Sequence, residues 1–459
     1  MNLLEYLKPG LIFIFLTVLM GSCSKEESTY LPDPELDTEV ELRSINITPS
    51  GDVAGVTDAN AIEQALNDAN PGEEVKLEKG IFYINRPIVA PVGFKGKLKG
   101  KKPGDDGTRI IAVGSQAAPF GLTTVSNFEF ASDPSQEVGL TTMFYFPEPS
   151  ESLTVSDMEL VVDDEFFSEF WTSPPSGPTN ALAFMIYVAM GDSEANTTFK
   201  NLKLQGTDIT PGYVRAEFLP FQPVFGITVS GDSETLPVPQ SGGDHKVEKC
   251  DFDKMGLRPI EYRLFKDAKI EIKENTITNV KQVLVKWLNG TDVKIENNFI
   301  SHTLLGGLVV SQEGESVGTD PCKIEIKNNS VETGIDPIFP FSFGAEVGIE
   351  IGSATNFDVT IKNNDIQLVP LNNSYPRAGI SIGGVDGAKV ENNDITGQSI
   401  EGIILFGASN CELKGNDLAN LTASSAGYTL DDNTNNCTVE IPDNASVLDN
   451  GMDNTIEYK

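Results

Sequence analysis

The phrase IEIKNNSV at residues 324–331 is one of seven copies of a pattern that fills the second half of this chain. Each copy has two apolar residues separated by a spacer, then two spacers, an asparagine, a spacer and a final apolar residue. The aligned asparagines are Asn275, Asn298, Asn329, Asn364, Asn393, Asn416 and, in a loose copy, Asn444. Self-similarity at intervals of 23 to 35 residues predicts stacked units, none of which can bury its apolar face alone. Because the apolar residues alternate and no helical pattern separates the copies, each unit is predicted to be a coil of parallel strands.

The repeated asparagine has a physical role in such a coil. Asn tolerates the left-handed backbone region better than most residues, so it suits the bend between two strands. Buried at that bend, its amide can bond to the Asn of the coils above and below, and so form a ladder of satisfied amides. Weaker upstream copies have Cys250, Leu202, Met158 and Phe128 at this position. The ladder is therefore expected to change into an apolar stack toward the N-terminus.

A capping helix is predicted before the first coil. Thr57-Asp58 suits its start, apolar residues from Ile62 to Ala69 line one side, and Pro71-Gly72 ends it. Such a helix would cover strand edges that otherwise invite another chain. The segment DANAIEQALNDANPGEEVKLEKGIFYI (58–84) and the Asn phrase together resemble the pectate lyase superfamily. A leucine-rich repeat horseshoe would need L-x-x-L-x-L phrases, which we do not find.

The resemblance covers roughly residues 46–459 and implies an all-β fold, a right-handed parallel β-helix with an N-terminal capping helix. The phrases predict about eleven coils, or roughly 50 Å of strands stacked 4.7–4.9 Å apart. Two intervals between phrases are much longer than the rest, which predicts long loops at about 161–197 and 205–245. Extra length in a repeat usually becomes a loop on the binding face.

The N-terminus indicates export. The apolar run Leu11–Met20 is too short to span a bilayer and fits the core of a signal peptide. The following Gly21-Ser22-Cys23 resembles a bacterial lipobox, which implies a lipoprotein signal peptide at 1–22 and lipid on Cys23. An ordinary signal peptide with an incidental Cys is the alternative. Residues 23–45 are polar and acidic, and we expect them to form a tether.

The start of this tether, Ser24-Lys25-Glu26-Glu27, resembles the export tag of surface lipoproteins in Gram-negative glycan degraders. The expected location is therefore the outer membrane, with the protein lipid-anchored and facing outward. The chain has 67 acidic and 33 basic residues and a net charge of −34. This charge argues against nucleic acid as a partner and favours loosely held cations. Of five cysteines, the four after Cys23 are expected to be buried stack members, because no metal-site spacing occurs.

A candidate site lies on the strand that follows each Asn phrase, where the superfamily binds substrate. Arg263 and Lys286 are 23 residues apart, so they should stack on neighbouring coils and face outward. A Lys base beside an Arg that neutralises a uronate carboxylate is what β-elimination requires. Glu261 and Glu350 are candidates to hold Ca²⁺ against the sugar acid. The arrangement resembles that of β-helical alginate and chondroitin lyases; a solvated salt-bridge ladder is the alternative.

The two long loops contain candidate substrate-binding residues. Phe170 and Trp171 lie in the first loop, and Tyr213 and Arg215 in the second. Aromatic rings can stack on sugars, although these side chains would equally serve to pack the loops onto the coil. With only two histidines in the chain, catalytic triads and His-rich zinc sites are improbable.

The sequence thus predicts a surface lipoprotein that acts on an acidic polysaccharide, as a β-eliminating lyase. One alternative is a non-catalytic lipoprotein that binds polysaccharide for a glycan-uptake system, together with the other proteins of that system. A second alternative is a β-helical glycoside hydrolase, although the polygalacturonase sequence pattern is absent.

Overall fold

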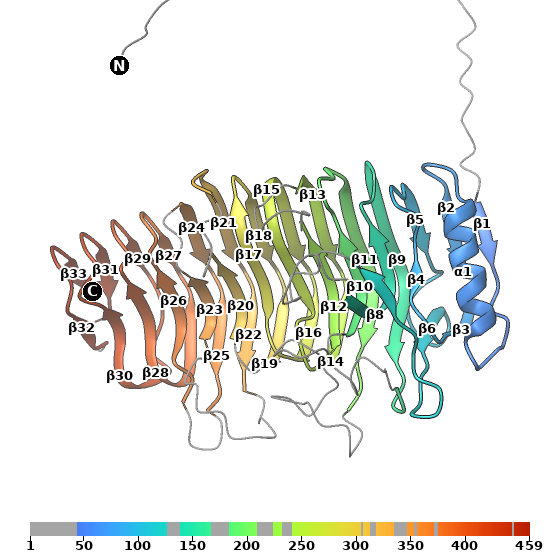
Figure 1. Cartoon of the computed structure of the whole chain (residues 1–459). Coiled ribbons are helices and arrows are strands. Elements are labelled where there is room, and N and C mark those ends of the chain that lie inside the picture. Colours follow the sequence, from blue (N-terminus) through green and yellow to red (C-terminus); the bar gives the residue numbers. More distant parts are fainter. Residues whose placement is uncertain are drawn as a thin grey trace, which may run out of the picture. The chain divides into compact units, whose positions relative to one another are not determined.

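The computed structural model describes residues 44–125, 138–166, 183–208, 224–231, 241–303, 306–312, 318–334, 347–352, 356–370, 375–442 and 445–459. These residues belong to one compact unit, Leu42–Lys459, which is a right-handed parallel β-helix (Figure 1). The predicted signal peptide, Cys23 and nearly all of the tether lie outside the described ranges. Within those ranges no helix is long and apolar enough to cross a membrane.

The strands stack in three faces. The first face contains the Asn phrases: β1 (Ser44–Ile47), β2 (Glu74–Leu77), β5 (Gly96–Lys99), β9 (Ser152–Val162), β11 (Asn196–Gln205), β13 (Ser241–Glu248), β15 (Ile260–Lys273), β18 (Asp292–Glu296), β21 (Cys322–Lys327), β24 (Phe357–Lys362), β27 (Lys389–Glu391), β29 (Glu412–Lys414), β31 (Thr438–Ile441) and β33 (Thr455–Tyr458).

The second face follows the Asn position. Its strands are β3 (Gly80–Ile84), β6 (Thr108–Ala112), the ends of β9 and β11, β14 (Asp251–Met255), β16 (Thr276–Val280), β19 (Phe299–Thr303), β22 (Ser330–Thr333), β25 (Asp365–Leu368), β28 (Asp394–Phe406) and β30 (Leu421–Leu430).

The third face completes each coil. It contains β4 (Ile88–Val89), β8 (Val138–Pro147), β10 (Ala183–Ala189), β12 (Val224–Ser230), the start of β15, β17 (Val283–Asn289), β20 (Gly306–Ser311), β23 (Val347–Gly352), β26 (Ala378–Gly383), the ends of β28 and β30, and β32 (Val447–Asp449). The short strand β7 (Thr123–Val125) pairs antiparallel with β8. The predicted number of coils stays a prediction, because several coils include residues outside the described ranges.

The predicted amide ladder is confirmed from Asn275 to Asn416. Each side-chain amide donates from Nδ2 to the Oδ1 atom of the next asparagine, at 2.9–3.0 Å. The same Oδ1 accepts the backbone N–H of the preceding asparagine at 3.0–3.1 Å. Each Nδ2 also donates to a backbone carbonyl of the preceding coil. Asn444 lies outside the described residues.

The left-handed residue of each bend is not the ladder asparagine, as we had expected, but the residue before it. Glu274, Asn297, Asn328, Asn363 and Asn392 have φ angles of 54–57°. The bend therefore uses two residues with separate roles: the first adopts the left-handed conformation, and the second turns its amide into the interior.

Upstream, the ladder gives way to an apolar stack, as predicted. The Cys250 backbone N–H donates to Asn275 Oδ1 at 2.9 Å, and Leu202 and Met158 are buried in register below it. Cys250 and the other three described cysteines are buried free thiols. Phe128 lies outside the described residues. On the N-terminal side of β9, the strands that pair with it are β5 and β6.

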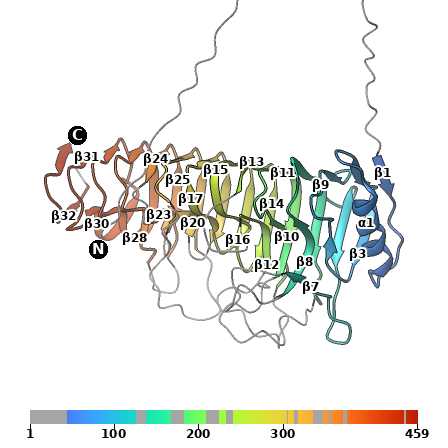
Figure 2. The same cartoon turned by 45° about the horizontal axis from the view of Figure 1, so that its top comes forward.

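The capping helix is confirmed as α1 (Val56–Asp68), which contacts β1, β3 and β4 at the end of the stack (Figure 2). Its start differs from the prediction. Gly55, at φ 78°, is the N-cap residue, and Asp52 Oδ2 accepts the Thr57 backbone N–H at 2.9 Å. Asp58 is buried instead, where it accepts the backbone N–H groups of Ser50 and Tyr83 at 2.8 and 2.9 Å.

The two expected long loops contain strands that the sequence analysis missed. The range 161–197 includes β10 (AFMIYVA), and 205–245 includes β12 (VFGITVS) and the start of β13. Every described residue of β12, and all but the last of β10, is buried. Strands covered on both sides lose the apolar–polar alternation by which a strand is recognised in sequence.

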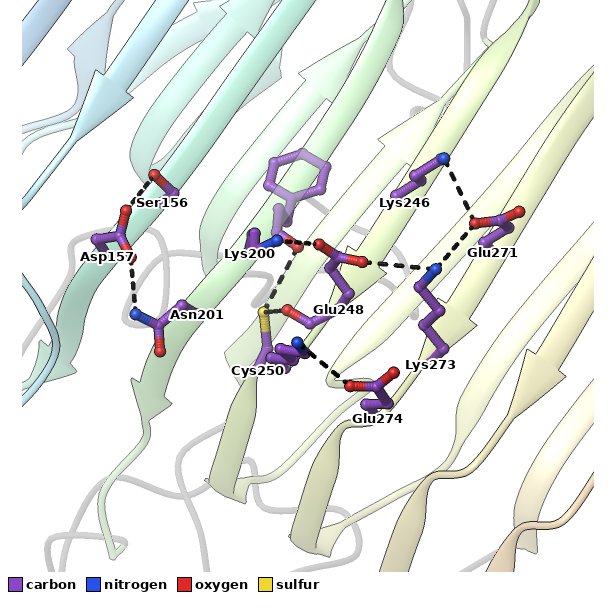
Figure 3. A network of polar contacts seen from close by, with 12 residues as sticks. Ser156, Asp157, Lys200, Asn201, Lys246, Glu248, Cys250, Glu271, Lys273 and Glu274 are labelled. Atoms are coloured by element: carbon purple, nitrogen blue, oxygen red, sulfur yellow. Dashed lines mark hydrogen bonds and ion pairs between the residues drawn. The ribbon is translucent and has the colours of Figure 1, made fainter.

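The outer side of the first face carries a neutralised charge ladder (Figure 3). Glu248 lies between Lys200 at 2.6 Å and Lys273 at 3.6 Å, and Glu271 lies between Lys273 at 3.4 Å and Lys246 at 3.5 Å. These side chains are all partly exposed to solvent, so each pair contributes little to stability. Alternating charges also leave this surface without a net preference for an anionic ligand.

The ladder leads to a stability prediction for Asn364→Ala. The change removes the acceptor of the Asn329 backbone and side-chain N–H groups, and the bond that Asn364 donates to Asn393. We expect it to lower the free energy of unfolding by about 1–3 kcal/mol, because buried donors lose their acceptor. Urea denaturation measures this, with the exposed Asn433→Ala as control. Equal effects of the two substitutions would contradict a stabilising ladder.

Candidate functional site

Strand register on the third face brings the predicted catalytic pair together. Arg263 on β15 lies opposite Lys286 on β17, and Ser230 on β12 lies opposite Arg263 on the other side. The prediction that Arg263 and Lys286 stack on neighbouring coils is therefore confirmed. Their 23-residue spacing spans one complete coil, so the two side chains occupy equivalent positions.

Glu261 joins these cations in one group. Its Oε1 atom lies 2.7 Å from Arg258 Nη1 and 3.9 Å from Lys286 Nζ. Arg263 donates from Nε to Ser230 Oγ at 2.9 Å, and its Nη2 lies 3.5 Å from Tyr187 Oη. We call Arg258, Glu261, Arg263 and Lys286 the cation cluster. With three cations and one carboxylate it carries a net charge of +2, in a chain whose net charge is −34.

Two of the four members of the cluster are buried, which differs from the expectation of outward, solvent-facing side chains. Arg263 and Glu261 have no exposed surface, and the Lys286 side chain is 13% exposed. The alternative, a salt-bridge ladder of Glu261–Arg263 with Lys286 on a solvated face, does not hold in that form, because Glu261 and Arg263 are buried; Glu261 does contact Lys286. The alternation of residues in the sequence correctly predicted which side of the strand Arg263 and Lys286 occupy. It could not predict whether other parts of the protein cover that side.

Electrostatics hold Glu261 ionised. Burial by itself would raise the pKa of this carboxyl group. The nearby charges, first Arg258 and then Arg263 and Lys286, outweigh burial, so the pKa lies below its usual value. The carboxylate is thus a fixed negative charge that organises the three cations around it.

Several buried polar atoms of this region have no hydrogen-bond partner within the described ranges. They are Glu261 Oε2, Arg258 Nε and the Oγ1 atom of Thr228, which lies opposite Glu261 on β12. Buried polar atoms in proteins are nearly always paired with protein, water or ligand. The cluster therefore offers bonds both to an anion and to hydroxyl groups.

The residue after each stacked cation has an unusual backbone. Leu264 and Trp287 have φ angles of 63° and 57°, whereas equivalent positions in later coils have Gly384 and Gly407. Bulky residues in the left-handed region are strained, and such strain gathers at functional sites. The strain places the Trp287 ring 3.5 Å from Lys286 Nζ, a cation–π contact.

Apolar groups border the cluster on the third face. Toward the N-terminus, Phe184 stacks on Phe225 with ring centroids 4.7 Å apart, and Tyr187 packs beside them. Toward the C-terminus, Val347, Ala378 and Ile404 form a second cluster, next to which Arg377 lies 4.5 Å over the Phe406 ring. A charged centre between apolar clusters is the composition of many ligand sites.

Four residues of this region escaped the sequence analysis: Arg258, Tyr187, Thr228 and Ser230. The last three lie on β10 and β12, which had been taken for loops. Arg258 could have been found from the sequence, because it precedes Glu261 by three residues in the segment RPIEYR (258–263).

The predicted calcium ligands do not fit one ion. In register, Glu261 is followed by Leu284, Val309 and then Glu350, which separates the two carboxylates by roughly 14 Å at the usual strand spacing. Calcium ligands lie about 2.3–2.6 Å from the ion. Among the described residues no group of three or more His, Cys, Asp or Glu is placed to hold a metal. The single predicted Ca²⁺ site is therefore not supported.

The remaining predicted site residues, Phe170, Trp171, Tyr213 and Arg215, lie outside the described residues. Their neighbour Phe166 is described, and it is buried with its ring 5.4 Å from that of Phe120. That residue packs its segment onto the coil. The buried His245 is bonded to Thr197 and Gly242, and burial lowers its pKa to about 4, so it is a structural residue.

Comparisons with known proteins agree on the fold. DFA-IIIase from Arthrobacter chlorophenolicus A6, a mutant solved in complex with DFA-III, has a TM-score of 0.53 at 12% identity, over 90% of this chain and 96% of that one. The same enzyme without its lid has a TM-score of 0.52 at 12% identity, over 90% of this chain and 95% of that one. A mannuronan C-5 epimerase A-module from Azotobacter vinelandii has a TM-score of 0.49 at 12% identity, over 89% of this chain and 92% of that one.

No protein-family model matches the sequence, and no curated protein matches it significantly. At 12% identity the structural likeness shows the fold alone. The chain is a parallel β-helix, and its candidate site is the cation cluster on the third face.

The burial of Glu261 leads to a pH-dependent prediction. Glu261→Gln leaves three cations without their carboxylate and should cost about 3–5 kcal/mol of unfolding free energy at pH 7. Because the folded-state pKa is lowered, this contribution is complete above the ordinary value of 4.5 and is lost as the pH falls through the folded-state value. Urea titrations should show a smaller difference in unfolding free energy between the parent and Glu261→Gln below pH 4 than at pH 7.

The matched control is Glu325→Gln on the first face, where Glu325 lies between Lys323 at 3.0 Å and Lys327 at 3.3 Å. These side chains are partly exposed, so the loss of their two contacts should lower the free energy of unfolding by less than about 1 kcal/mol. A larger loss for Glu325→Gln than for Glu261→Gln would contradict the electrostatic account of the cluster.

Proposed function

We propose that this protein acts on an acidic polysaccharide, and that the cation cluster receives an anionic group of that polymer. The observation that carries the proposal is the set of three cations around the ionised Glu261 carboxylate, in a strongly acidic chain. The Arg258 and Lys286 side chains keep exposures of 20% and 13%, so a uronate carboxylate can contact them from solvent.

The reaction we propose is β-elimination. The carboxylate of the sugar is neutralised by the arginines, which makes the adjacent C5 proton acidic. Lys286 acts here in its uncharged form: its Nζ takes that proton, the C5–H electron pair forms a C4–C5 double bond, and the C4–O glycosidic bond breaks. The protonated Lys286 then returns the proton to the oxygen of the leaving sugar. Lys286 suits the role of base because its side chain keeps some exposure. The two arginines cannot act as bases, since they stay protonated.

Two observations bear on the alternatives. The complete burial of Arg263 and Glu261 leaves Arg258 and Lys286 as the members of the cluster that a ligand can contact, which also suits a non-catalytic lipoprotein that holds glycan for neighbouring uptake proteins. A glycoside hydrolase would need two carboxyl groups on either side of the scissile bond, whereas the cluster contains one. The β-helix of DFA-IIIase, solved with DFA-III, supports an enzyme on this fold.

We also propose that the protein is anchored in the outer membrane through lipid on Cys23. The support is the sequence alone: the short apolar run, the small residues before the cysteine and the acidic segment behind it. A tether of this composition would hold the β-helix away from the membrane surface.

Substitutions at Lys286 test the reaction. Lys286→Arg keeps the charge but not a base, so it should retain binding to an acidic polysaccharide and lose formation of unsaturated product, measured by ultraviolet absorbance. The control Lys294→Ala, an exposed residue of β18, should behave as the parent. Product formation by Lys286→Arg at the parental rate would refute Lys286 as the base. Retardation of the parent in affinity gels, without product from any acidic glycan, would favour the binding protein.

Cys23→Ala tests the anchor. Without the lipidated cysteine the protein should move from the membrane to the soluble fraction, because stable anchoring needs the acyl chains. Cell fractionation with immunoblotting measures this. Unchanged membrane association of the variant would rule out the lipoprotein proposal.

A further inference from the structure

A second candidate site lies on the second face, apart from the cation cluster. A cleft of about 380 Å³ opens over the outer side of β3, β6, β9 and β11, in the N-terminal part of the stack (Figure 1). Its residues follow the strand register: Tyr83 lies opposite Ile111, Ile111 opposite Val161, and Val161 opposite Gln205. One row of side chains therefore runs along the floor of the cleft.

The floor is apolar at its centre. Ile111 and Val161 point outward, where this row elsewhere has polar residues such as Asp253 and Thr278. The Tyr83 ring closes one end, and the Gln205 amide lies at the other. Around these two aliphatic side chains the exposed surface of the cleft is mostly polar, and its volume falls within the range of small-molecule sites.

The polar groups of the cleft are acceptors rather than free cations. Asp163 and Gln205 make no side-chain hydrogen bond or ion pair with the described residues, whereas Asp164 accepts a bond from Thr207 Oγ1 at 2.5 Å. The one guanidinium of the cleft, that of Arg109, is already engaged by Glu159 at 3.5 Å. The buried Glu159 carboxylate also binds Lys203 at 2.9 Å.

This chemistry selects among ligands. Two adjacent carboxylates repel an anion, so a uronate is disfavoured here. A metal ion is disfavoured because the described residues offer no group of three ligands at this place. A neutral sugar fits: its C–H face packs on Ile111 and Val161, and its hydroxyl groups donate to Asp163 and Gln205. Carboxylates and amides are strong acceptors of hydroxyl hydrogen bonds.

We propose that this cleft binds a neutral sugar residue. The site would be independent of the anionic site on the third face, and the proposal does not require that the protein be a lyase. On a polysaccharide with both acidic and neutral residues, the two sites would recognise different units.

Saturation-transfer NMR tests the proposal with free sugars as probes. The probes are D-glucose, D-galactose and D-mannose as neutral sugars, D-glucuronate as the anion and D-glucosamine as the cation. Any saturation transfer to D-glucuronate should come from the cation cluster and should be unaffected by Asp163→Ala. Through the cleft, the parent should transfer saturation to at least one neutral sugar. Asp163→Ala should weaken that binding by about tenfold, the loss expected for a hydrogen bond to a charged acceptor. Tyr83→Ala should weaken it as well.

Two controls separate this site from others. Asp365→Ala removes an exposed carboxylate from the same outer side of the second face, on β25, and should leave neutral-sugar binding unchanged. Lys286→Ala should also leave it unchanged, which distinguishes the cleft from the cation cluster. The proposal is overturned if no neutral sugar binds, if Asp163→Ala binds as the parent does, or if only D-glucuronate or D-glucosamine binds.

Discussion

The amide ladder is the interaction on which the rest of the structure depends. Each ladder asparagine bonds to the next one through both its backbone N–H and its side chain, and to a carbonyl of the coil behind it. These bonds fix the register between coils, because a slip by one residue would leave buried amides without partners. A fixed register in turn determines which side chains from distant parts of the sequence become neighbours on the other two faces.

The cation cluster follows from this register. Arg263 and Lys286 meet because the same phrase begins both coils, and Glu261 lies near enough to pair with Lys286. The first face distributes its charges in alternation and keeps them partly solvated, as Figure 3 shows. The third face instead gathers three cations around one buried carboxylate, between two apolar clusters. Two faces built from the same repeat thus differ in their chemistry, and only one has a composition suited to an anionic ligand.

Much of the fold could be predicted from the sequence, because the Asn phrase encodes both its strands and its bend. The stacking of Arg263 on Lys286 was predictable for the same reason, since the shortest interval corresponds to one coil. The burial of Glu261 and Arg263 was not predictable, because it depends on which other parts of the protein cover the third face. The strands β10 and β12 escaped recognition because burial on both sides removes alternation. Glu350 was misplaced as a partner of Glu261 because alternation gives the side of a strand but not the number of coils between two residues. The cleft at Ile111 and Val161 could not be predicted from the sequence, because outward-facing apolar residues cannot be distinguished there from core residues.

The account is tested most directly by a crystal structure of the protein with a bound acidic oligosaccharide. We expect a carboxylate of the ligand within hydrogen-bond distance, about 3 Å, of Arg258 and Lys286, the partly exposed cations of the cluster. A ligand bound along the charge ladder of the first face, with the cation cluster left untouched, would contradict the central claim that the third face recognises the anion.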